Sequence, residues 1–168
     1  MARELLGKVL LYDGREGRRA ARLVEVEAYH GSRDPASHAF RGPTPRTEVM
    51  FGRPGHAYVY LSHGVWYCMN VVAHDFDVAG AVLLRGAEPL EGFADGARLS
   101  GPGLLGRAFG LSTTCSGVDL TRSALQLRDA PAVAPRQIAR GPRIGISDSA
   151  TSAKRWRFWV RGSSGVSR

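Results

Sequence analysis

The sequence of 168 residues has no long hydrophobic run. Its purely apolar stretches, such as Ala81–Leu84, are only a few residues long, whereas a membrane-spanning helix needs ~20 apolar residues. This excludes a transmembrane helix. Residues Met1–Gly7 include Arg3 and Glu4 and lack the apolar segment and cleavage site of a secretory signal. We therefore expect a cytoplasmic protein with no membrane partner.

Cysteine is scarce, and patterns typical of metal or nucleotide binding are lacking. Cys68 and Cys115 form no CxxC pair, and a chain of this length needs no disulfide, so we expect both to be reduced and structural. The five histidines follow neither the HExxH pattern nor the paired spacing of zinc hydrolases. No Walker A loop or dinucleotide fingerprint occurs. The sequence thus predicts no metal and no cofactor.

Lysine is also rare: 21 of the 23 basic residues are arginine, and the formal net charge is +8. Residues 1–97 hold eleven basic and twelve acidic residues, whereas residues 98–168 hold twelve and three. A basic half is typical of proteins that bind phosphate groups, which favours a nucleic-acid partner. An arginine-rich gene composition would give the same count without any ligand. The basic run Lys154–Arg161 alternates with period two, which predicts a strand rather than a membrane-surface helix.

The composition that remains is that of a globular protein, with 43% hydrophobic and 23% charged residues. The length favours one domain over 1–168. Helical signals are confined to Glu4–Leu6 and Gly103–Phe109. Strand patterns recur along the chain, at Lys8–Tyr12, Arg22–Tyr29, His56–Leu61, Val65–Val72, Ala81–Arg85, Leu125–Leu127, Arg143–Ser147 and Arg155–Arg161. We predict a single-domain α+β fold, with a largely antiparallel mixed sheet, a protruding β-hairpin and few short helices.

Several local expectations accompany this fold. Gly31–Arg53 is predicted to be a long surface loop of the kind that often binds ligands. Glu88–Leu90 should turn the chain away from the strand at Ala81–Arg85. Ser100 should cap the helix at Gly103–Phe109, and Gly110 should end it. Most of residues 111–142 is expected to form loops.

The strand Arg22–Tyr29 carries the best candidate for catalysis. Its alternation places Leu23, Glu25, Glu27 and Tyr29 on one face, and Val24, Val26 and Ala28 on the other. A carboxylate between Val26 and Ala28, beside Tyr29 and close to the following loop, would be partly desolvated, and its pKa would rise toward that of a general base. Glu27 is therefore the candidate base; the alternative is a structural glutamate in a salt bridge.

The two strands after the long loop form a predicted hairpin. Ser62, His63 and Gly64 connect them, which places His63 at the tip. Aromatic rings gather on this hairpin, at Tyr58, Tyr60, Trp66 and Tyr67. A narrow aromatic hairpin could enter a nucleic-acid groove, although period-two spacing also places some of these rings in the core.

The motifs EAY (27–29), TPR (44–46), YVY (58–60), CMN (68–70) and LLRxxEP (83–89) occur in this order. From about Arg3 to Gly162 the chain resembles the alkyladenine (3-methyladenine, methylpurine) DNA glycosylase family. The resemblance implies a base-excision-repair hydrolase that flips an alkylated or deaminated purine out of duplex DNA. Such an enzyme hydrolyses the N-glycosidic bond and leaves an abasic site, without metal or cofactor.

The same resemblance implies roles for individual residues. Glu27 would activate a water against C1′, and Arg85 would help hold that water. The other residues would contact the base or the DNA: Tyr29, His38 and Tyr60 stack on or border the flipped base, Asn70 crowds the 2-amino group of guanine, and the hairpin-tip residue fills the gap in the duplex. That tip residue is usually tyrosine in the family, and here it is His63. Imidazole is smaller and can be protonated, so we expect this residue to hold the flipped state less well than tyrosine, or in a pH-dependent way.

The expected partner is double-stranded DNA containing damaged purines, with the protein acting as a monomer and lying near the nucleoid if its source is prokaryotic. The chain is also short between Glu91 and Ser100 compared with the family, so DNA contacts from that region would be missing. Two other functions stay open: a lesion-binding protein that does not hydrolyse DNA, and an RNA-binding module that uses the same basic strand and rings.

Overall fold

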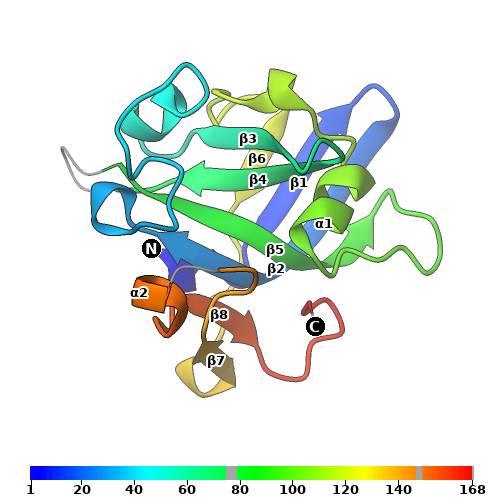
Figure 1. Ribbon diagram of the computed structural model, residues 1–168. Helices are drawn as coiled ribbons and strands as arrows, with labels where there is room; N and C mark the ends of the chain where they lie inside the picture. The colour runs from blue at the N-terminus through cyan, green and yellow to red at the C-terminus, as the bar shows by residue number, and fades with distance from the viewer. Residues whose placement is uncertain (75–78, 147–148, 168) are drawn as a thin grey trace.

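The computed structural model describes residues 1–74, 79–146 and 149–167 (Figure 1). Within these residues eight strands form one sheet, and every pairing in it is antiparallel. The main order is β3-β4-β5-β2-β1-β6, and β8 pairs with both β2 and β7. The strands are β1 (Val9–Gly14), β2 (Gly17–Tyr29), β3 (Ala57–Ser62), β4 (Trp66–Val72), β5 (Ala81–Glu91), β6 (Leu125–Arg128), β7 (Ile138–Gly141) and β8 (Arg157–Val160). The predicted α+β class and the antiparallel sheet are confirmed.

The helices are short, as predicted. Helix α1 (Pro102–Ala108) packs beside β4, and α2 (Ser149–Ser152) precedes β8 (Figure 1). The remaining helical turns are 3₁₀, at Ala2–Leu5, Gly31–Arg33, Glu48–Phe51, Thr113–Cys115 and Pro135–Gln137. Among the described helices none is long and apolar enough to cross a membrane.

Helix α1 differs from its prediction at its start. Its N-cap is Gly101, whose φ is 131°, and no side chain caps the helix, so the capping role expected for Ser100 is wrong. Pro102 supplies the first turn instead, because its fixed φ suits a helix and it lacks the N–H that a cap would satisfy. Gly110, with a φ of 65°, ends the helix as predicted.

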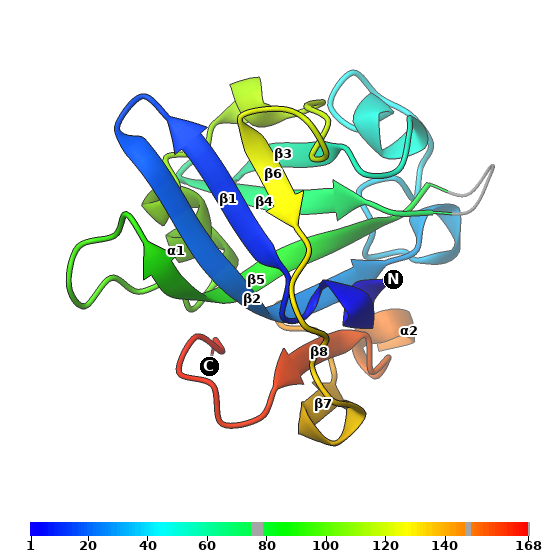
Figure 2. The same cartoon turned by 180° about the vertical axis from the view of Figure 1, so that it is seen from behind.

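Strand β2 changes neighbours halfway along its length. Its first half lies between β1 and β5, and its second half lies between β8 and β5 (Figures 1 and 2). The register against β5 shifts on both sides of Glu25. Such bulges bend a strand and increase its twist. The bend separates the second half of β2, which includes Glu27, from β1, and that half pairs with β8 instead.

The main core combines strand residues such as Leu10, Leu23 and Met69 with Leu105 of α1 and Phe109 directly after it. Burying each such side chain contributes about 1.5–3 kcal/mol. A second cluster lies under the 31–53 segment, which the sequence predicted as a surface loop. There Ala39 and Met50 pack on Tyr58 and Val72. The loop is thus fixed to the sheet by buried side chains, although much of its surface is exposed.

The predicted end of the strand at Ala81–Arg85 is wrong. Strand β5 continues through Glu88–Leu90, where a turn was expected. Pro89 is tolerated there because it lies opposite Ala21 at a register shift, and because β4 pairs with β5 only along Ala81–Leu83. That edge of β5 is therefore free of β4, and the missing N–H of proline removes no bond to it.

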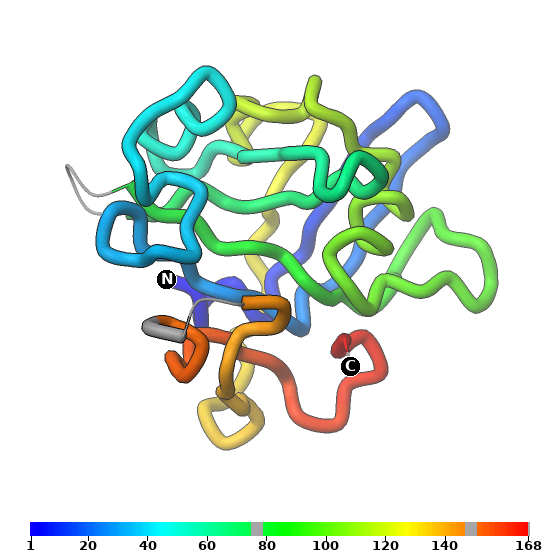
Figure 3. The backbone as a smooth tube through the Cα atoms, viewed as in Figure 1, coloured from blue at the N-terminus to red at the C-terminus, as the bar shows by residue number. Residues whose placement is uncertain are grey.

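The closing strands also differ. Residues 138–141, expected as loop, form β7, which pairs with β8. The strand predicted at Arg143–Ser147 is absent over the described residues 143–146, and Ser147 lies outside the described residues. The backbone at 143–146 instead crosses in front of β2 (Figure 3), where the N–H of Ile144 bonds to a side chain of β2 rather than to a neighbouring strand.

Candidate active site

A pocket of about 520 Å³ opens beside the β3–β4 hairpin. Its walls come from β2, β3, β4 and β5, from the 31–53 segment, from the start of α1 and from residues 144–146. Six of the residues to which the family resemblance gives a role line it: Tyr29, His38, Tyr60, His63, Asn70 and Arg85. The fold therefore brings together residues that lie up to 56 positions apart in the chain, from Tyr29 to Arg85.

Glu27 lies next to this pocket rather than in its wall. Its side chain is 0% exposed. One carboxylate oxygen, Oε1, accepts a hydrogen bond from the backbone N–H of Ile144 at 2.8 Å. The other, Oε2, accepts one from the hydroxyl of Tyr29 at 3.0 Å. Tyr29 and Ile144 both line the pocket, so the carboxylate lies directly behind the pocket wall.

The surroundings of Glu27 set its proton affinity. Burial raises the pKa of Glu27 above its usual range, and the charge of Arg85 and the N–H of Ile144 reduce that rise. Burial also raises the pKa of Tyr29, with the charge of Glu27 acting in the same direction. The Tyr29 hydroxyl therefore stays protonated and remains a donor. A carboxylate with this environment can act as a base at neutral pH.

Arg85 lies between the two glutamates of β2. Its Nη1 is 3.5 Å from Oε2 of Glu27, and its Nε is 3.4 Å from Oε1 of Glu25. Its Nη2 donates to the hydroxyl of Ser167 at 3.2 Å. These distances lie at or beyond the long end of the usual hydrogen-bond range. Arg85 therefore faces the pocket with donor capacity that the described part of the protein uses weakly.

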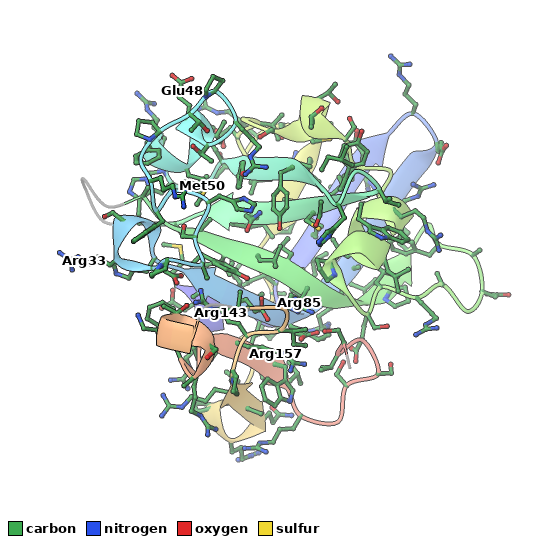
Figure 4. All side chains as sticks on the ribbon, viewed as in Figure 1. Arg33, Glu48, Met50, Arg85, Arg143 and Arg157 are labelled. Carbon is green, nitrogen blue, oxygen red and sulfur yellow. The ribbon has the colours of Figure 1, made fainter. Side chains whose placement is uncertain are left out.

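Glu25 is on the same face of β2 as Glu27, as predicted, but its partners differ. Its carboxylate accepts from Nε of Arg157 at 2.5 Å, and from the N–H and hydroxyl of Ser167 at 2.6 and 2.9 Å. Figure 4 shows Arg85 and Arg157 in the same region, along β2 and β8. Glu25 is thus a fully partnered structural carboxylate, the role that the sequence left open for Glu27.

Aromatic rings form one wall of the pocket. The ring of His38 lies edge-on to Tyr60, with centroids 4.5 Å apart, and Tyr60 stacks on Tyr58 at 5.5 Å. Nδ1 of His38 is 2.9 Å from the hydroxyl of Tyr58. Burial lowers the pKa of His38, and the charge of Arg46 lowers it further, so the imidazole is neutral at pH 7. Aromatic faces of this kind suit a flat, electron-poor ring.

The comparisons with known proteins agree with this geometry. The family model described as "Methylpurine-DNA glycosylase (MPG)" matches residues 1–164. The chain belongs to the methylpurine-DNA glycosylase family. A protein of Myxococcus xanthus named "Putative 3-methyladenine DNA glycosylase" is 46% identical over all of this chain and 87% of its own length. One of the same name from Anaeromyxobacter dehalogenans strain 2CP-C is 50% identical over all of this chain and 81% of its own length.

Membership of the methylpurine-DNA glycosylase family confirms the resemblance read from the motifs. Of the residues in those motifs, Asn70 is buried, and its amide donates to the backbone carbonyl of Tyr58 at 3.2 Å. His63 lies in the turn between β3 and β4, as predicted, with its side chain exposed. Its φ of 49° is unusual for a residue other than glycine, and the Ser62 hydroxyl lies 3.1 Å from its Nδ1.

Sequence reasoning missed one buried ion pair of this glycosylase. Asp34 and Arg143 both have fully buried side chains. Nη1 and Nη2 of Arg143 donate to the two oxygens of Asp34 at 2.5 and 2.9 Å, and Nη1 also donates to the carbonyl of Ala28 at 3.0 Å. The partners are 109 positions apart, Asp34 in the predicted loop and Arg143 at the start of a predicted strand. The sequence therefore carried no local signal for the pair.

Two further kinds of site, a metal-binding cluster and a reactive cysteine, are absent from the part of the chain that the structure describes. There, no three His, Cys, Asp or Glu side chains gather closely enough to hold a metal ion. Cys68 lines the pocket and Cys115 lies in the main core, and both are buried and free. Burial raises the pKa of Cys68, which keeps its thiol protonated.

Proposed function

We propose that the protein is a monofunctional DNA glycosylase that flips alkylated or deaminated purines out of duplex DNA and hydrolyses their N-glycosidic bond. The observation that carries the proposal is the buried carboxylate of Glu27. It lies directly behind an aromatic-walled pocket and is held by a backbone N–H and a tyrosine hydroxyl. A purine in that pocket would present its glycosidic bond toward the same wall.

In the proposed reaction, Glu27 takes a proton from a water molecule, whose oxygen attacks C1′ of the flipped nucleotide. The C1′–N bond breaks, and its electron pair leaves with the purine. The carboxylate also opposes the positive charge that develops on the sugar. Arg85, with its weakly used donors, orients the water. An alkylated purine carries a positive charge and leaves readily, and its weak pairing lowers the cost of extrusion.

The pocket residues would select the base. Tyr29, His38 and Tyr60 stack on or border the purine, and cationic lesions gain from the aromatic faces. Asn70, fixed by its bond to Tyr58, would exclude guanine by contact with the 2-amino group. His63 at the exposed hairpin tip would fill the space that the flipped nucleotide leaves.

The proposed partner is double-stranded DNA, bound by a monomer that forms one glycosylase domain over residues 1–168. The excess of positive charge supports this, because residues 98–168 hold twelve basic and three acidic residues. Binding should therefore weaken as salt is added.

The test is a single-turnover excision assay. Duplexes that contain one hypoxanthine or one 3-methyladenine are incubated with excess protein, and abasic sites are then cleaved with alkali. We expect product from at least one lesion and none from the undamaged duplex. Binding of both lesions without product at any pH from 5 to 9 would reject the enzymatic proposal.

One observation favours the second candidate, a lesion-binding protein without hydrolysis. Glu27 is fully buried and lies 3.5 Å from Arg85, as a structural glutamate in a salt bridge would. The Glu27→Gln variant separates the two candidates. Loss of excision with retained binding supports the glycosylase, whereas a wild-type protein that binds damaged DNA tightly and releases nothing supports the binding protein.

A further inference from the structure

The Asp34–Arg143 pair lies beside Glu27 but contributes no atom to the pocket wall. Its geometry is bidentate, and both side chains are excluded from solvent. The ring of Tyr29 lies 4.5 Å from the Arg143 guanidinium, and the ring of Trp156 lies 5.2 Å away. The guanidinium therefore has fixed partners in its own plane and on its faces. Figure 4 shows Arg143 close to the second half of β2.

Arg143 is in contact with two of the residues that donate hydrogen bonds to the carboxylate of Glu27. Ile144 follows Arg143 directly in the chain, and its N–H donates to Oε1 of Glu27. Tyr29, whose ring lies against the guanidinium, donates to Oε2. Between them, the carbonyl of Ala28 accepts from Nη1 of Arg143. One guanidinium thus joins residues 143–144 to residues 28–29, and Glu27 accepts one bond from each side.

We propose that Asp34 and Arg143 are positioning residues, which hold the two hydrogen-bond donors of Glu27 in place and so fix the direction of its carboxylate toward the pocket. The inference rests on the proposed function, in which Glu27 is the general base. Neither residue touches substrate in this proposal. Asp34 fixes the guanidinium, and the guanidinium fixes Ile144 and Tyr29.

A purely structural role explains this arrangement less well. A buried ion pair is a weak source of stability, since apolar side chains of similar size serve as well. Its planar, two-bond geometry is instead suited to fixing orientation. Catalytic rates depend on such orientation, because a displacement of about 1 Å at the reacting groups can cost about 100-fold.

The pair should also influence the proton affinity of Glu27. The groups that face this carboxylate are Arg85 on β5, Glu25 and Tyr29 on β2, Tyr60 on β3, and Arg143 with the N–H of Ile144 on the segment after β7. Arg157 on β8 is the register partner of Glu27, and its guanidinium bonds to Glu25. Loss of the Ile144 and Tyr29 donors removes bonds that favour the ionised carboxylate, so the pKa of Glu27 should rise further. The acid limb of the pH profile of excision, where Glu27 becomes protonated, should therefore move to higher pH.

The experiment compares two bidentate Arg–Asp pairs of the same protein. Arg143→Lys keeps the charge and removes the two-bond geometry, and Asp34→Asn keeps the shape and removes the charge. The matched control is the exposed pair on the β1–β2 hairpin, where Arg18 donates to Asp13 at 2.7 and 3.2 Å. Arg18→Lys and Asp13→Asn make the same chemical changes far from the pocket. Single-turnover excision is measured for all four variants from pH 5 to 9, together with binding of the damaged duplex.

We expect Arg143→Lys and Asp34→Asn to lower the excision rate about 10- to 100-fold. The acid limb of the pH profile should move to higher pH, while affinity for damaged DNA stays within about threefold of that of the wild type. Arg18→Lys and Asp13→Asn should change neither rate nor limb. An unmoved acid limb in folded Arg143→Lys, or an equal effect of the control pair, would overturn the proposal.

A folding defect in one variant can be distinguished from loss of the positioning role by the other variants. If Arg143→Lys does not fold, the isosteric Asp34→Asn decides, and Tyr29→Phe, which removes only one donor, should move the acid limb in the same direction. An unmoved limb in both rejects the positioning role. The proposed function has its own test, because full activity of Glu27→Gln would reject Glu27 as the base whatever the Asp34–Arg143 pair does.

Discussion

Two buried arginines lie on either side of Glu27, and they are held in different ways. Arg143 makes two short bonds to Asp34 and a third to a backbone carbonyl. Arg85 lies 3.4–3.5 Å from its two glutamates and makes one bond of 3.2 Å, to Ser167. Arg85 lines the pocket, whereas Arg143 does not. Each arginine has a buried Nε without a hydrogen-bond partner in the described residues, so the contrast lies in the terminal nitrogens. Those of Arg143 make short bonds and act as framework, whereas those of Arg85 make long contacts beside a cavity and are available to a ligand.

The carboxylates beside these arginines show the same contrast. For Asp34, burial favours the neutral acid, yet the hydrogen bonds from Arg143 and from the N–H of His30 outweigh it and lower the pKa below its usual range. For Glu27, burial is the larger effect, and the pKa rises despite Arg85. Geometry decides the sign: close bidentate contact stabilises the ionised form strongly, and a 3.5 Å contact does so weakly.

Replacing Glu27 tests whether the carboxylate with the raised pKa is the general base, and it has the largest expected effect. Glu27→Gln should lower single-turnover excision about 10²- to 10⁴-fold, the usual contribution of a general base. Binding of the damaged duplex should stay close to that of the wild type, because the side chain keeps its size. Excision kinetics and an electrophoretic binding assay on one protein preparation measure both. Wild-type excision in this variant would assign the base to another residue.

Replacing each of the two arginines by methionine tests whether Arg143 contributes more to stability than Arg85 does. Arg143→Met leaves Asp34 charged and buried without its counter-ion, with only the backbone N–H groups of His30 and Ala36 as donors, so the free energy of unfolding should fall by about 3–5 kcal/mol. Arg85→Met should cost only about 1–2 kcal/mol, since Glu25 keeps Arg157 and Ser167. Urea unfolding at pH 7 measures the two values. Equal losses would show that the longer contacts of Arg85 matter as much as the bidentate pair.

The difference between the two arginines could not be predicted from the sequence. The strand pattern correctly placed Glu25, Glu27 and Tyr29 together, but it wrongly added Leu23, which the register shifts at Glu25 turn into the main core beside Val26. The Ser62–Gly64 turn correctly placed His63 at the hairpin tip, because turn chemistry is a local property. The Asp34–Arg143 and Glu25–Ser167 contacts join positions 109 and 142 apart. Strand β7 has four residues, and its only strand partner in the described residues is β8, so its signal is too short to detect.

The pH dependence of stability sharpens the comparison, since the two carboxylates should act in opposite directions. Asp34 has a lowered folded pKa, so its contribution is present above its unfolded pKa, near 3.8, and is lost as the pH falls through its folded value. Glu27 has a raised folded pKa, so folding binds a proton between its unfolded value, near 4.5, and that folded value, and stability declines as the pH rises through this window.

The measurement is thermal unfolding of the wild type, Asp34→Asn and Glu27→Gln between pH 3 and 8. Relative to the wild type, Glu27→Gln should gain stability as the pH rises above about 4.5, whereas Asp34→Asn should lose stability as the pH rises toward 3.8 and stay level above it. The two difference curves should therefore have opposite slopes. Parallel curves would contradict the assignment of one carboxylate to each kind of site.

The smallest expected effect is at Ser167, which joins the weakly held arginine to the strongly held glutamate. Ser167→Ala removes the hydroxyl that accepts from Arg85 and donates to Glu25, but it keeps the backbone N–H on Glu25 at 2.6 Å. The stability loss should thus be about 0.5–1.5 kcal/mol. If Arg85 orients the water, freeing its Nη2 should still lower excision several-fold without changing binding. A stability loss with unchanged excision would show that the guanidinium is positioned by the two glutamates alone.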